Sequence, residues 1–164
     1  MPIPTAVTFY DFILALHIMA VVAAFGVTFA YPIMFTIAAK SQPSAIPLLH
    51  RIEYTLARRL INPLLVVITA AGIYLASDEH LWKEFFVQWG IAIVLVIGAL
   101  LGAVMIPASK KAEELATRDL AGAAGGESAA MSDEYKAVVR RITLVGSTLS
   151  GLVLLTILFM AIQP

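Results

Sequence analysis

Four long apolar stretches are the feature that most limits how this chain can fold. They cover approximately residues 9–37, 60–76, 85–106 and 142–162. An α-helix needs roughly 20 apolar residues to cross a hydrocarbon core of about 30 Å, and each stretch reaches or approaches that length. The strands of a membrane β-barrel would instead alternate in hydrophobicity over about ten residues, and the sequence shows no such pattern. We therefore expect an all-α fold: a membrane four-helix bundle with four transmembrane helices.

Composition supports a membrane protein over a soluble one. Hydrophobic residues make up 60% of the 164 residues and charged residues 13%, whereas soluble domains average roughly 45–50% and about 25%. The formal net charge is zero, so nothing in the charge balance favours nucleic acid as a partner. The expected partner is the lipid bilayer. The sequence has no cysteine, which excludes disulfides and thiolate metal sites.

The basic residues predict the orientation of the spans. Ten of the eleven lie in two connections, residues 38–59 and 107–141. The positive-inside rule makes these connections cytoplasmic and places both termini outside. The segment 44–59 has apolar residues at helical spacing and is expected to extend the second span inward. We expect one integral membrane domain over residues 1–164.

Two further patterns concern the arrangement of the spans. The Gly-rich residues 121–134 predict a flexible cytoplasmic hinge. The pairs Arg58–Arg59 and Arg140–Arg141 open two similar apolar runs about half a chain length apart, which suggests two repeated helical hairpins. Gly98 and Gly102 form a GxxxG motif, for which we favour packing within the bundle over a dimer interface.

His17 is the one ionisable residue deep in a predicted span. Ala20 and Ala24 follow it at helical spacing, so His17 is expected to face the bundle with space beside it. One interpretation is a neutral histidine that hydrogen-bonds a hydroxyl or a backbone carbonyl of a neighbouring span. The other is a metal ligand, most naturally to the iron of haem b, with the alanines leaving room for a flat ring. Both interpretations stay open.

The candidate cofactor-binding residues are therefore His17, Ala20, Ala24 and Met160. A haem on His17 would be five-coordinate, would take Met160 as a second ligand, or would take a second His17 across a homodimer. One histidine with scattered methionines is a thin ligand set for copper, and zinc would need more ligands. His50 and His80 are expected to be surface histidines. No catalytic residues are proposed.

The stretch "LALHIMAVVAAFGVTF" resembles the first span of a group of small bacterial membrane proteins. That group gathers the DUF-2269 family of predicted integral membrane proteins, the CopD-like copper-resistance domains and the HemJ-type protoporphyrinogen oxidases. The shared features here are Leu16–His17, Gly26 and Arg58–Arg59. The resemblance implies a four-helix bundle in the bacterial inner membrane and, by analogy with HemJ, His17 as a ligand of haem b. Phe25 replaces the tryptophan common before the glycine, and no lysine lies inside a span, which argues against oxidase chemistry.

Three functions follow from these patterns. The first is a haem-binding membrane protein with a role in electron transfer or haem handling, and its chemistry, if enzymatic, would be that of an oxidoreductase. The second is a non-enzymatic structural or accessory membrane protein, alone or in a homodimer or larger complex. A small transporter or channel is the least favoured, because no Asp, Glu, Lys or Arg is expected deep in a span.

Overall fold

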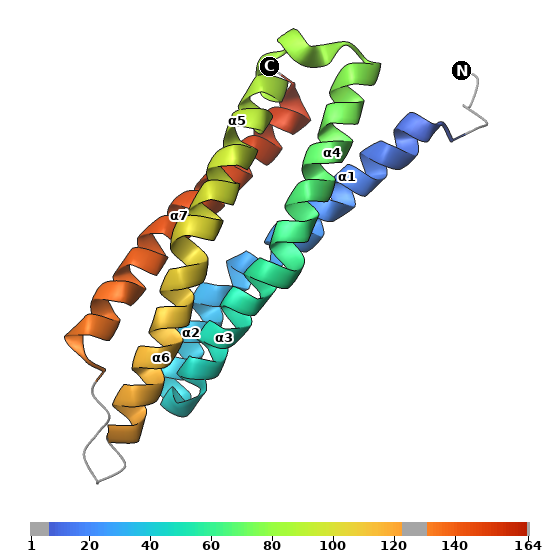
Figure 1. The fold of residues 1–164 in the computed structure, drawn as a ribbon. Coiled ribbons are helices and arrows are strands. Elements are labelled where there is room, and N and C mark those ends of the chain that lie inside the picture. The colour runs from blue at the N-terminus through green and yellow to red at the C-terminus, as the bar shows by residue number, and fades with distance from the viewer. Residues whose placement is uncertain (1–6, 123–130, 164) are drawn as a thin grey trace.

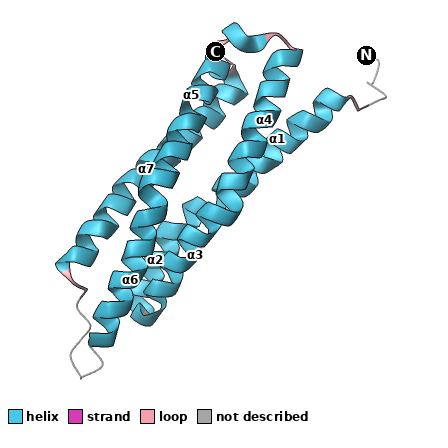
Figure 2. Ribbon diagram, viewed as in Figure 1, coloured by secondary structure: helices cyan, strands magenta, loops and turns pink. Residues whose placement is uncertain are grey.

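The computed structural model describes residues 7–122 and 131–163 and contains no strand within those ranges (Figures 1 and 2). Four helices are long and apolar enough to cross a membrane: Phe9–Ser41, Pro43–Asp78, Phe85–Gly122 and Asp133–Ile162. The all-α fold with four membrane-spanning helices is thus confirmed, and the protein is a multi-pass integral membrane protein. The Gly-rich connection expected to be a flexible hinge lies mostly in 123–130, outside the described residues.

Each of the first three long helices consists of two α-helices joined by an irregular turn. The first long helix contains α1 (Phe9–Phe25), η1 (Gly26–Ala30) and α2 (Tyr31–Ser41), and the second contains η2 (Pro43–Ala45), α3 (Ile46–Leu56), η3 (Ala57–Ile61) and α4 (Asn62–Asp78). The short η4 (Leu81–Lys83) lies in the connection to the third, which contains α5 (Phe85–Leu100), η5 (Leu101–Met105) and α6 (Ile106–Gly122). The fourth long helix, α7 (Asp133–Ile162), is uninterrupted over 30 residues.

Proline explains where these interruptions fall. Pro32, Pro63 and Pro107 each stand second in the α-helix that follows η1, η3 or η5. Proline lacks an N–H group, and its ring collides with the carbonyl four residues earlier, so the turn before it cannot keep regular α-helical bonds. The η1 turn tightens to a 3-10 helix, whereas η3 and η5 widen to π-helices. Helix α7 has no internal proline, and it is regular throughout.

The interruptions separate two halves of the molecule, which Figure 1 shows along its long axis. On one side, α3 packs against α2 and α6, and α6 packs against α7; we call this the charged half. On the other side, α1 packs against α4, and α5 packs against α7; we call this the apolar half. A helix of 36 residues is about 54 Å long, which exceeds the hydrocarbon thickness of about 30 Å. The long helices therefore continue beyond the membrane, and the charged half contains most of the ion pairs.

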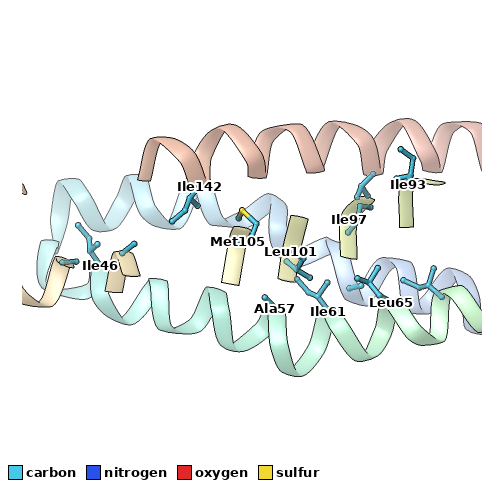
Figure 3. Packing of buried hydrophobic residues seen from close by; sticks show 14 of the residues in the cluster. Ile46, Ala57, Ile61, Leu65, Ile93, Ile97, Leu101, Met105 and Ile142 are labelled. Carbon is cyan, nitrogen blue, oxygen red and sulfur yellow. The ribbon is translucent and has the colours of Figure 1, made fainter. Parts of the chain in front are cut away.

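The larger of two apolar core clusters runs through both halves as one line of contacts, and a smaller cluster of Ala76, Phe86 and Val87 lies apart from it on α4 and α5. Buried residues on the second long helix face buried residues on the third in antiparallel order (Figure 3): Ala57, Ile61 and Leu65 on one, and Met105, Leu101 and Ile97 on the other. Burial of apolar surface gives stability only where water is displaced. In the membrane, close packing of small residues takes over, and Ala20 and Ala24 are the buried residues of α1.

The GxxxG motif does not pack inside the bundle as the sequence suggested. A Cβ atom added at Gly98 or at Gly102 would meet no atom within 4 Å. Gly102 is exposed and Gly98 is half-buried, whereas Ile93, Ile97 and Leu101 are buried and form the inner side of the α5–η5 segment. The expectation of packing within the bundle is wrong because larger aliphatic residues take the inward positions.

Candidate functional site

His17 lies at the interface between α1 and α4 in the apolar half. Its ring nitrogen Nδ1 donates a hydrogen bond to the backbone carbonyl of Ile68, over an N···O distance of 3.0 Å. Gly72 makes room for this contact, because a Cβ atom there would lie 3.3 Å from Cε1 of His17. A glycine one turn after Ile68 lets the imidazole reach the helix backbone. The ring thus ties the two helices together.

This hydrogen bond fixes the tautomer of the ring. A carbonyl oxygen can only accept a hydrogen bond, so Nδ1 carries the proton and Nε2 carries the lone pair. Among the described residues, the fully buried side-chain nitrogen and oxygen atoms without a partner are Tyr31 Oη and Ser109 Oγ. Nε2 of His17 is not one of them. A protonated Nδ1 held by a carbonyl is the usual arrangement of a histidine whose Nε2 binds a metal.

The other predicted cofactor residues lie at two different interfaces. Ala20 and Ala24 are 4% and 0% exposed and pack in the core cluster with Ile68. They bring α1 close to α4. Met160 lies on α7, where its methyl group occupies the space that a side chain at Gly90 of α5 would need. The structure thus places His17 with the two alanines and places Met160 in the other helix pair.

The prediction for His80 and the prediction for His50 have opposite outcomes. His80 is exposed in the turn between α4 and η4, as expected. His50 is only 1% exposed, so the expectation of a surface histidine is wrong. The second long helix continues past the apolar stretch, and its charged end is covered by other helices. His50 on α3 is thereby enclosed in the charged half.

His50 is the centre of a buried polar cluster, which we define as His50, Glu53 and Tyr135. His50 Nδ1 faces Oε2 of Glu53 at 3.4 Å, and Nε2 lies 3.0 Å from the hydroxyl of Tyr135 on α7. With a neutral ring, Nδ1–H donates to the carboxylate and Nε2 accepts from the phenol.

Aromatic contacts and burial hold the cluster in place. The ring of Phe35 on α2 packs on the His50 ring with centroids 4.6 Å apart. Glu53 is 6% exposed and Ser109 1% exposed. Side chains of α2, α3, α6 and α7 therefore enclose the polar cluster.

Sequence reasoning missed this cluster, although a signal was present. The buried positions of α3 are Ile46, His50 and Glu53, followed by Ala57 in η3. They recur at the spacing of one helix face, so an apolar face with two polar residues in line marks a buried polar pair. Within the described ranges, no three His, Asp or Glu side chains form a metal-binding group.

Comparison of the chain with protein-family models, with curated proteins and with solved structures finds no match in any of the three. The proposals below therefore depend on the residues and their geometry.

Proposed function

We propose that this membrane protein binds haem b through Nε2 of His17 and serves in electron transfer or haem handling. The observation that carries the proposal is the hydrogen bond from His17 Nδ1 to the Ile68 carbonyl at 3.0 Å. It leaves a neutral imidazole with its lone pair on Nε2, which is the donor that haem iron takes from a protein. The resemblance of the segment around His17 to the DUF-2269, CopD-like and HemJ-like group supports the same proposal.

Within one chain, the candidate residues supply a single axial ligand to a haem iron, the imidazole of His17. Met160 packs against Gly90 in the α5–α7 pair, whereas His17 belongs to the α1–α4 pair. The proposal is therefore a five-coordinate haem, or a haem shared with a second His17 in a homodimer. Bound haem would supply one-electron chemistry. The chain's own contribution is to fix the orientation and the tautomer of the ligating imidazole through Ile68.

The proposed setting is a bacterial inner membrane with both termini outside. The distribution of basic residues supports this orientation, because the ion pairs of Arg51, Lys111 and Arg118 all lie in the charged half. Under the positive-inside rule that half would face the cytoplasm. The aromatic side chains Trp82 and Trp89 lie toward the opposite end, as membrane-interface anchors do.

An absorption spectrum of the detergent-purified protein tests the proposal. We expect a Soret band that is lost in His17→Ala and kept in His80→Ala, a matched variant that removes an exposed histidine. A colourless protein after expression with added haem precursor would contradict haem binding. So would a Soret band that persists in His17→Ala, because it would place the haem elsewhere.

A second candidate function is that of a non-enzymatic accessory membrane protein. The contacts of His17 with Gly72 and Ile68 favour this function, because the hydrogen bond to Ile68 that would orient a metal ligand also joins two helices. For this function the protein would be colourless. His17→Ala would change only stability, by roughly 0.6–2 kcal/mol for one interhelical hydrogen bond in a membrane.

A further inference from the structure

The carboxylate of Glu53 has fewer partners than its burial requires. It is 6% exposed, and the partner recorded for it is His50 Nδ1 at 3.4 Å from Oε2. An ionised carboxylate has about four acceptor sites, and a buried polar group without partners raises the free energy of the folded state. Something further must satisfy this carboxylate.

The hydroxyl of Tyr31 reaches the cluster from α2. Phe35 packs against His50 at a centroid distance of 4.6 Å. Tyr31 precedes Phe35 by one helical turn, and Glu53 follows His50 by one turn on α3, which runs antiparallel to α2. Tyr31 and Glu53 therefore face each other, and the charge of Glu53 acts on the Tyr31 phenol. Tyr31 Oη is fully buried and has no hydrogen-bond partner among the residues that the structure describes.

Ser109 reaches the same place from the third long helix. Arg51 Nε donates to Glu113 Oε1 at 2.7 Å and so fixes the antiparallel pairing of α3 with α6. The buried residues of α3 and η3 are, in chain order, Ile46, His50, Glu53 and Ala57, and those of the antiparallel η5–α6 segment are, in reverse order, Ala116, Leu115, Ala112, Ser109 and Met105. Ser109 is level with Glu53. It is 1% exposed, and within residues 7–122 and 131–163 its hydroxyl has no hydrogen-bond partner.

We propose that Glu53, His50 and Tyr135 form a site that binds one proton. A water held by Tyr31, Ser109 and Glu53 exchanges that proton with the site. Buried waters typically make about three hydrogen bonds to polar groups that lack other partners. Two orphaned hydroxyls and one under-satisfied carboxylate are such a set. The proposal does not depend on haem or on His17, which lies in the other half of the molecule.

The buried negative charge of the cluster is the reason that we expect it to bind a proton. Among the described residues Glu53 forms no ion pair with a Lys or an Arg, and the side chain that it contacts is His50. With a neutral imidazole the buried set carries one negative charge, which is costly in a low dielectric. One proton taken from water makes the set neutral: Nδ1–H still donates to Oε2 of Glu53, the added proton resides on Nε2 of His50, and the Tyr135 hydroxyl turns from donor to acceptor at Nε2. The titratable groups that face it are Tyr31 from α2 and Tyr135 from α7, with the charge of Asp119 acting on Tyr135.

The sign of the stability change tests the bound water. Tyr31→Phe and Ser109→Ala each delete one hydroxyl from the intact protein, with Tyr54→Phe as the matched control outside the cluster. If a water bridges them, each deletion lowers the Tm, by about 2–4 °C for 1 kcal/mol in a chain of this size. The double variant then loses no more than the larger single loss. A rise in Tm, no change, or additive losses would overturn the bound water.

Nuclear magnetic resonance tests the proton. The ¹⁵N signals of His50 and the side-chain ¹³C signal of Glu53 are followed with pH in micelles, with assignment by His50→Gln and Glu53→Gln. We expect both residues to follow one curve that corresponds to one proton, and Tyr135→Phe to change that curve at both. Two independent curves, or no titration of either residue, would overturn the proton-binding site.

Discussion

The indole nitrogen of Trp89 donates a hydrogen bond to the hydroxyl of Thr156, 3.0 Å away, and so ties α5 to α7. His17 ties α1 to α4 in the same way, through Ile68. Each helix pair of the apolar half therefore contains one polar bond in addition to its packing. In a membrane, where apolar side chains gain little by leaving lipid, such bonds help to specify which helix pairs with which.

Replacing Trp89 tests the second of these ties. Trp89→Phe removes the donor, and Thr156 keeps its own bond to the Leu152 carbonyl. We expect a loss of about 0.6–1.7 kcal/mol, the range found for interhelical hydrogen bonds in membranes, together with some lost packing. Reversible unfolding in mixed micelles measures it. Trp82→Phe, at a residue 44% exposed, is the control, and an equal loss there would refute the specific role of Trp89.

Alanine at Gly72 and at Gly98 should have opposite effects. Within a helix, alanine is favoured over glycine by about 0.5–1 kcal/mol. At Gly98 the added Cβ meets no atom within 4 Å, so the variant should be more stable. At Gly72 the Cβ would lie 3.3 Å from Cε1 of His17, whose ring is held by Ile68, so the gain should be absent or reversed. Equal gains at both positions would show that His17 moves freely.

The contact between Gly90 and Met160 should appear as an energetic coupling. The methyl group of Met160 occupies the space of a Cβ at residue 90, so Gly90→Ala must displace it. The double variant Gly90→Ala/Met160→Ala should recover part of the loss. We expect a coupling energy of about 0.5–3 kcal/mol, the range for residues in contact. Strict additivity in the four-member cycle would argue against the contact.

Two neighbouring residues on α3 should differ sharply in their effect on stability. His50→Ala leaves the Glu53 carboxylate and the Tyr135 hydroxyl buried without their partner, and each unsatisfied buried group costs about 1–3 kcal/mol. Arg51→Ala removes an ion pair whose arginine side chain is 64% exposed, and exposed pairs contribute about 0–1 kcal/mol. Chemical unfolding of the two variants side by side provides the comparison. Similar losses would show that His50 is open to solvent and does not hold Glu53 and Tyr135 in the core.

The helices of the apolar half could be predicted from the sequence because one physical requirement governs them. A helix that crosses lipid must satisfy its backbone internally and be apolar over its length, and both conditions are visible in residues 85–106 or 142–162. The prediction that His17 hydrogen-bonds a backbone carbonyl was one of two open interpretations, and Ile68 is that carbonyl. Whether Nε2 also binds iron remains a proposal.

The buried residues of the charged half could not be predicted from the sequence, because their burial depends on the lengths of several helices at once. Residues 38–59 and 107–141 read as polar connections, yet α3 and α6 continue the membrane helices and pack on each other. His50 is buried by Phe35 of α2 and Tyr135 of α7, both distant in sequence. The outward position of Gly102 was missed for a related reason: a GxxxG motif marks a smooth helix surface but not its neighbour.

Proline-linked turns interrupt three of the long helices near their middle, at the level where the helices change partners, whereas α7 is unbroken over 30 residues. Bending therefore meets least resistance at η1, η3 and η5, where the regular hydrogen-bond ladder is already disturbed. Helix α7 has no such turn, so a bend between the charged half and the apolar half is taken up mainly by the three interrupted helices.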